Sequence, residues 1–226
     1  MSSPRARPRC GRLRTCAAAM VLLAASVRPE IIDRIAVVVG RDVITESALL
    51  RALRVTAFLN AEEPDFSPAA KRRAAERLVD QTLILREMET GRYALPDPSE
   101  VEQLLAQLRK ERFKTPEDFA RALTRYGITE EQLRDVLARQ LATLRFIELR
   151  FRPAVMVPES EIRHYYQTRV LARWDNKEGT KPPPLEDMWA AIEQVLAGEQ
   201  VDRLLEEWLR QARKQTRIEF KAKAFE

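Results

Sequence analysis

The chain has 226 residues, a formal net charge of +5 and two cysteines. Such a charge favours nucleic acid or an anionic membrane as partner, but the excess lies in a single segment. Residues 1–26 hold both cysteines, five of the 39 basic residues and no acidic residue, which leaves 34 basic against 34 acidic residues in the remainder. A neutral body argues against nucleic acid as the partner, and a body without cysteine suits an exported protein.

Residues 1–26 have the pattern of a secretory signal peptide. A basic stretch, residues 1–15, precedes the apolar run CAAAMVLLAASV, and Ala24, Ala25 and Ser26 offer a cleavage site. Twelve residues are too few to span a bilayer core, which takes roughly 20. We expect a cleaved signal and no stable membrane span afterwards; an uncleaved N-terminal anchor is the alternative.

A β-hairpin is predicted next. Residues 31–39 are mostly β-branched, which suits a pleated surface. Gly40 and Arg41 fit a two-residue turn with glycine at its first central position. Val43 and Ile44 then return to a β pattern, and Thr45 is the expected N-cap of a first helix.

Helices account for most of the remaining chain. Their expected starts are Ser67-Pro68, Asp97-Pro98-Ser99-Glu100, Thr115-Pro116, Thr129-Glu130 and Val157-Pro158. The longest one carries an apolar stripe at helical spacing: Leu133, Val136, Leu137, Leu141, Leu144, Ile147 and Phe151. A final helix runs from Leu185 to about Lys214, with Gly198 as an interruption that bends it.

The last segment alternates apolar and polar residues from Arg217 to Lys223, as a strand does. A two-stranded hairpin alone is marginal in water, so we expect this segment to pair with the N-terminal hairpin. The predicted fold class is mainly α: a multi-helix core with a small antiparallel sheet formed by the N-terminal hairpin and the C-terminal strand.

No arrangement of residues indicates catalysis, a metal site or a cofactor. His164 is the only histidine, and the body offers no cysteine as a second ligand. Gly40 is not followed by a phosphate-binding glycine pattern. Acids alternate with arginines along the helices, as on a solvated face. An exported helical protein of this kind is better suited to binding other chains than to chemistry.

Four stretches of the sequence resemble SurA-type periplasmic chaperones. They are IIDRIAVVVGRDVITESAL, ERLVDQTLILREMETGRYALPDPSEVEQLLAQL, TPEDFARALTRYGITEEQLRDVLARQLATLRFIELRF and VPESEIRHYY. The resemblance covers Ile31 to about Tyr166. It implies that the N-terminal helical domain and the C-terminal helix form one core, with the C-terminal strand on the hairpin. It also implies a periplasmic, ATP-independent holdase for unfolded or partly folded exported proteins, outer-membrane proteins among them.

The sequence departs from that family between Tyr166 and Leu185. Family members usually carry one or two parvulin-type prolyl isomerase domains there, and a folded domain needs roughly 50 residues. This chain has only a short polar, proline-rich bridge, so we expect no isomerase activity. The expected organisation is a signal peptide (1–26), a helical domain (27–172), a linker (173–184) and a C-terminal helix and strand (185–226).

Client binding is the expected function, and Leu53, Phe58 and Leu59 on the first helix, with Trp174 at the bridge, are the candidate client-binding residues. Two alternatives remain open at this point. One is a structural subunit of an envelope assembly with a single fixed partner, and the other is a prolyl isomerase with a degenerate site.

Overall fold

The computed structural model describes residues 33–174 and 182–226, so the predicted signal peptide and the start of the predicted first strand lie outside the described residues. Asp33–Glu226 form one compact unit. Its elements are β1 (Ile35–Val39), β2 (Asp42–Thr45), α1 (Glu46–Asn60), α2 (Pro68–Thr90), α3 (Pro98–Arg112), α4 (Pro116–Tyr126), α5 (Glu130–Arg150), α6 (Glu159–Tyr165), α7 (Leu185–Gln215) and β3 (Ile218–Phe220). No helix in these ranges is both long and apolar enough to cross a membrane.

Short polar side chains begin α1 to α5 where the sequence predicts, whereas α6 and α7 begin after a proline without a side-chain capping bond. The hydroxyls of Thr45, Ser67 and Thr115 each accept a hydrogen bond from a backbone N–H in the first turn of α1, α2 and α4. Asp97 and Thr129 form capping boxes at α3 and α5. These bonds satisfy N–H groups that would otherwise lack a partner at the helix ends, so the helix starts are set locally.

The sheet joins the two ends of the described unit. Its strand order is β2-β1-β3, with β1 antiparallel to both neighbours. Gly40 has a φ of 61°, which a two-residue hairpin turn requires and which glycine adopts without strain. Val38 pairs with Glu219, which confirms the predicted pairing. The third strand is shorter than predicted, because a 3₁₀ turn at Ala222–Ala224 follows Phe220.

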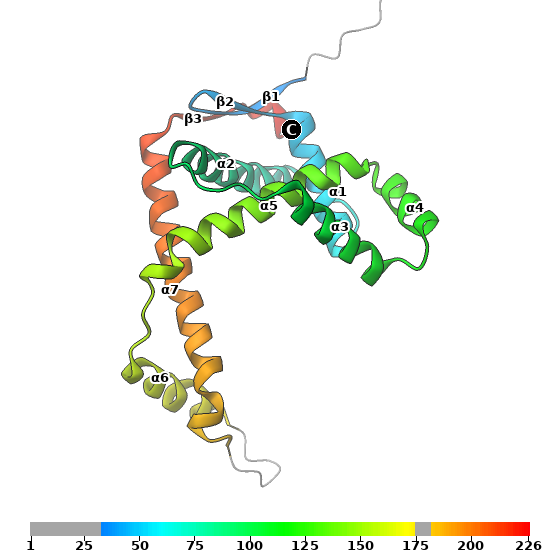
Figure 1. The fold of residues 1–226 in the computed structure, drawn as a ribbon. Coiled ribbons are helices and arrows are strands. Elements are labelled where there is room, and N and C mark those ends of the chain that lie inside the picture. The colour runs from blue at the N-terminus through cyan, green and yellow to red at the C-terminus, as the bar shows by residue number, and fades with distance from the viewer. Residues whose placement is uncertain (1–32, 175–181) are drawn as a thin grey trace, which may run out of the picture. The chain divides into compact units, whose positions relative to one another are not determined.

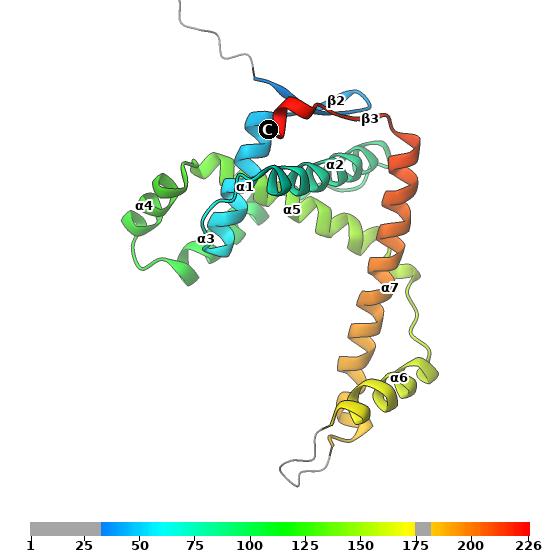
Figure 2. The same ribbon diagram turned by 180° about the vertical axis from the view of Figure 1, so that it is seen from behind.

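The strands lie over α2, and β3 lies beside β1 although almost 180 residues separate them in the sequence (Figures 1 and 2). A buried cluster fills the space between sheet and helices, with Val37 and Val39 from β1, Leu49 from α1 and Val79 from α2. The end of α7 and the C-terminal turn pack on the same cluster. The sheet therefore anchors the C-terminus to the first two helices, and the predicted mainly α fold with this small sheet is confirmed.

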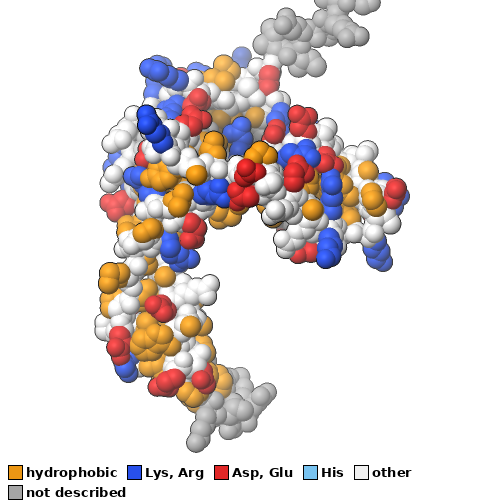
Figure 3. Space-filling model, viewed as in Figure 1, with side chains coloured by type: hydrophobic (Ala, Val, Ile, Leu, Met, Phe, Trp, Pro, Cys, Tyr) orange, Lys and Arg blue, Asp and Glu red, His pale blue; other side chains and the backbone are white. Residues whose placement is uncertain are grey.

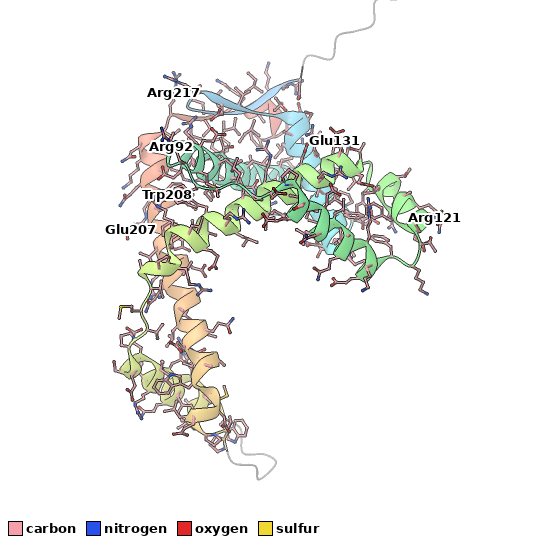
Figure 4. The ribbon with its side chains drawn as sticks, viewed as in Figure 1. Arg92, Arg121, Glu131, Glu207, Trp208 and Arg217 are labelled. Atoms are coloured by element: carbon pink, nitrogen blue, oxygen red, sulfur yellow. The ribbon has the colours of Figure 1, made fainter. Side chains whose placement is uncertain are left out.

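The buried face of α5 differs from the predicted stripe. Leu133 and Leu137 are buried as expected, but Leu144 is 59% exposed, and Phe146 is fully buried in its place. Phe146 packs against Trp208 of α7, with ring centroids 5.0 Å apart. Figure 4 shows the position of Trp208 on α7. Ala142 and Phe146, the buried residues in the second half of α5, pack with residues of α2 and α7, so the inward side of this half is rotated relative to the first half.

α7 runs from Leu185 to Gln215 without a break, so Gly198 does not interrupt it. Its C-terminal half contacts α2 and its N-terminal half packs on α6, where Ile162 and Ile192 are buried. α6 continues into a π-helical turn at Tyr166–Val170.

An ion-pair network ties the end of α7 to α2. Arg213 donates to Glu76 at 2.6 Å and to Asp80 at 2.7 Å. Partial burial acts to raise the pKa of Glu76, but the hydrogen bonds and charges of Arg213 and Arg72 together outweigh it, and the pKa lies below the ordinary 4.5. The pKa of Arg213 is raised, chiefly by the hydrogen bond to Asp80.

The lowered pKa of Glu76 gives an expected pH dependence. A carboxyl group whose folded pKa lies below its unfolded pKa stabilises the fold above the unfolded value, and loses that contribution as the pH falls through the folded pKa. We expect the free energy of unfolding, measured with urea, to fall as the pH is lowered below about 4.5. Glu76→Gln should shrink this decline, whereas Glu206→Gln on the exposed side of α7 should leave it unchanged.

Candidate functional site

A cleft lies between β2, α1, α2 and α5, with a volume of about 320 Å³. We call it the central cleft. Apolar side chains from all four elements form much of its wall: Val43, Ile44, Ala48, Ala52, Ala74, Leu78 and Val136. Ile44 and Ala74 also belong to the buried cluster under the sheet. The floor of the cleft is thus formed in part by the core itself.

Three arginines from three different helices surround this floor. Arg51 comes from α1, Arg77 from α2 and Arg139 from α5. Asp135 is the one carboxylate among the lining residues of the cleft, so the lining carries a formal charge of +2. None of the three arginines forms an ion pair or a side-chain hydrogen bond with the residues that the structure describes.

Arginines elsewhere on the same helices are paired. Arg86 on α2 binds Asp42 and the carbonyl oxygen of Val39, and Arg134 on α5 binds Glu102 and Glu130. These arginines thus have carboxylate partners, whereas Arg51, Arg77 and Arg139 form no ion pair with the described residues.

The pKa of Asp33 is lowered, first by the hydrogen bond from the Ser47 hydroxyl and least by the charge of a cleft arginine, Arg51. Ser47 thus holds Asp33 at the start of α1, and Asp33 is not among the residues that line the cleft. The guanidinium of Arg51 has no direct contact with that carboxylate.

Two further hollows adjoin the central cleft and share lining residues with it. One, of about 390 Å³, shares Val43, Thr82 and Arg139 and extends toward the hairpin turn. The other, of about 230 Å³, shares Thr56 and Arg77 and extends toward the loop after α1. The three hollows therefore lie next to one another on the surface of the protein.

A separate pocket of about 560 Å³ lies at the α3–α4 turn, walled by Phe113 and Phe119. The guanidinium of Arg109 lies over the Phe119 ring at 4.6 Å, and its Nε is buried without a hydrogen bond. Arg109 also pairs with Glu130 at the start of α5. This charge is compensated inside the protein, in contrast to the arginines of the central cleft.

Apolar side chains are also exposed around α6 and α7, where Figure 3 shows them gathered on the face in view. They include Met156, Leu171, Trp174, Val195 and Leu204. His164 lines a shallow pocket between α6 and α7, beside Glu161 and Arg203. Within the described ranges no three His, Cys, Asp or Glu side chains are placed to hold a metal ion.

The structure disperses the four candidate client-binding residues. Leu53 is 7% exposed in the cluster under the sheet, and Phe58 is 2% exposed in a cluster of four aromatic rings. Leu59 is half-buried against the same rings. Trp174 is exposed, at the end of the described segment. Leu53 lines the hollow toward the loop after α1 with little exposed surface, and Phe58 lines none of the hollows described here. The client-binding role of all four remains a prediction.

The residues that sequence reasoning missed are the arginines and small residues of the central cleft. Arg51, Arg77 and Arg139 lie in helices where basic and acidic residues alternate, and the pattern indicates only a solvated face. Alternation along one helix cannot show which charges lack a partner, because the partner comes from another helix.

Comparison with known proteins gives a distant match. No family model matches the chain. Chaperone SurA from Pseudomonas fluorescens (strain Pf0-1) is 26% identical over 145 residues, which make up 63% of this chain and 34% of that protein. The matched segment thus spans about a third of the relative's length. In sequence, the chain is distantly similar to chaperone SurA.

Proposed function

We propose that this protein is an ATP-independent holdase chaperone that binds non-native exported polypeptides, outer-membrane proteins among them, in the periplasm. The observation that carries the proposal is the central cleft: an apolar floor that stays open to solvent at the meeting point of β2, α1, α2 and α5. The distant similarity to chaperone SurA supports a chaperone-like role, and the exposed apolar side chains around α6 and α7 add further contact area.

The physical basis of such binding is the removal of apolar surface from water. Each Å² of apolar surface that a client buries contributes roughly 25 cal/mol, and many weak contacts of this kind give reversible binding. An unfolded client exposes apolar side chains that a folded protein hides, so the cleft distinguishes the two states without nucleotide. Release follows when the client folds.

The proposal includes no prolyl isomerase activity. Only residues 174–184 separate the last turn after α6 from the start of α7, and a segment of this length is far shorter than a folded domain of roughly 50 residues. A protease-coupled assay on a proline-containing peptide tests this point. Catalysis at ordinary enzyme levels would contradict it.

Light scattering with an unfolded outer-membrane β-barrel protein tests the holdase activity. We expect the purified protein to lower the aggregation of the client at a modest molar excess, with no ATP added. If aggregation is unchanged and pull-downs from the cell envelope give one tightly bound partner, the chaperone proposal is wrong and the protein is a structural subunit.

Variants of the cleft test its part in this activity. Val43→Ser with Val136→Gln removes apolar surface from two sides of the central cleft. We expect client affinity to fall roughly five- to tenfold, since about 1 kcal/mol or slightly more is lost. Val136 also packs on a buried cluster, so circular dichroism at the assay temperature checks that the variant is folded. Leu95→Ser is the matched control: Val43 and Leu95 are both 53% exposed, but Leu95 is not among the residues lining the cleft. An equal loss of client affinity in the two variants would show that the central cleft does not bind the client.

A further inference from the structure

We propose that the central cleft selects polypeptide segments in which a carboxylate side chain lies beside apolar side chains. This inference rests on the proposed function and specifies its substrate class. It starts from the convergence of Arg51, Arg77 and Arg139 on one apolar floor, with Asp135 as the one acid among the lining residues.

The chemistry of the guanidinium group identifies what is missing from the cleft. Arginine presents planar donors that match a carboxylate in a bidentate pair, and such charge-assisted bonds are stronger than neutral ones. Arg86 and Arg134 already have carboxylate partners inside the protein. The three cleft arginines have no ion-pair partner in the part of the chain that the structure describes, so a bound segment can supply the carboxylate.

The apolar floor makes a pair between an arginine and a bound carboxylate stronger than the same pair in open solvent. A bound segment covers Val43, Leu78 and Val136 and removes water from around the guanidiniums, and charges attract more strongly where water is excluded. A small inorganic anion covers none of this floor. The cleft therefore favours an anionic group that carries apolar neighbours, as a polypeptide segment does.

The adjoining hollows set how long a bound segment can be and where along it a negative charge is favoured. On the side of the loop after α1 the lining includes Glu62, Glu63 and Asp65, against Arg73 and Arg77. That end has more acids than bases, whereas the central cleft has the opposite balance. A segment with its carboxylates in the middle, rather than at the end near this loop, fits the distribution best.

The test compares two fluorescent peptides of about twelve residues with the same leucines and valines. One carries two central glutamates, and the other carries glutamines at the same positions. We expect the full chain to bind the glutamate peptide about tenfold more tightly in fluorescence anisotropy at low salt, a difference of about 1.4 kcal/mol. The preference should shrink as the ionic strength rises, because exposed charges are screened.

Variants locate the effect. Arg51→Gln, Arg77→Gln and Arg139→Gln together should abolish the preference while leaving the affinity for the glutamine peptide within about twofold. Arg139→Gln alone should reduce the preference about threefold, so the test does not depend on the triple variant folding. Arg210→Gln on α7 is the control, since Arg210 is exposed and is not among the residues lining the cleft. Its preference should equal that of the unaltered protein.

The outcomes separate this inference from the proposed function. Equal binding of both peptides, or an unchanged preference in the triple variant, overturns the charge selectivity and leaves the holdase in place. Displacement of the glutamate peptide by a short oligonucleotide at lower concentration than by unlabelled peptide also overturns it, in favour of a nucleic-acid site. If neither peptide binds and client aggregation is unchanged, the proposed function fails, and the inference fails with it.

Discussion

Replacing Phe146 by alanine should lower the free energy of unfolding by roughly 3–5 kcal/mol, the usual range for removing a buried phenylalanine. Phe146 is fully buried and contacts the rings of Tyr93, Phe151 and Trp208. These rings come from the loop after α2, the end of α5 and α7, so the lost side chain leaves a cavity that none of these elements can close alone. Urea denaturation followed by circular dichroism measures the change.

Leu144→Ala is the matched control for this prediction. Leu144 lies two residues away on α5, is also large and apolar, and is 59% exposed. Its removal should change the free energy of unfolding by no more than about 0.5 kcal/mol, as is usual for exposed positions. A larger loss at Leu144 than at Phe146 would mean that the predicted stripe, rather than the observed face, is the one that packs.

Removing Ile218–Glu226 should be about as destabilising, by roughly 3–5 kcal/mol on the basis of apolar surface returned to water. Ile218, Phe220 and Phe225 pack on the cluster under the sheet, and Ala224 is fully buried in it. The truncation also exposes the edge of β1, whose Ala36 carbonyl accepts from the N–H of Lys221 and whose Val38 pairs with Glu219. An uncovered edge of this kind promotes association between chains.

Urea denaturation and sedimentation velocity together measure both effects of the truncation. We expect a lower midpoint and a concentration-dependent dimer or larger species. Lys223→Ala is the control: its side chain is exposed, and the bond from Arg34 goes to its backbone oxygen, so the full-length variant should behave like the unaltered protein. A truncated chain with unchanged stability would show that β3 does not hold the unit together.

The large losses expected at Phe146 and β3 bear on the proposed function. Both changes affect how α7 is held against the first two helices, whereas the central cleft is formed by β2, α1, α2 and α5. A variant that loosens α7 but keeps client affinity would show that the cleft acts without the α6–α7 surface. If a variant that loosens α7 also loses client affinity, the exposed apolar residues of α6 and α7 contribute to binding.

Local sequence determined where the secondary structure begins and how the two ends meet. Thr45, Ser67, Asp97, Thr115 and Thr129 set the helix starts, because a capping bond joins residues only two or three positions apart. Gly40 set the hairpin turn through its positive φ. The pairing of the C-terminal strand followed from the exposed edge that an isolated hairpin leaves, an argument that also needs no coordinates.

Tertiary structure alone decided which side of α5 is buried and which arginines lack a carboxylate. The helical period admits Leu144 or Phe146 as the inward residue, and the position of α7 selects Phe146. Arg86 and Arg139 each have acidic residues nearby on their own helix. Arg86 pairs with an acid supplied by β2, whereas Arg139 forms no ion pair with the described residues. Side-chain partners of this kind come from elements far apart in the chain, so the spacing of residues along one helix carries no information about them.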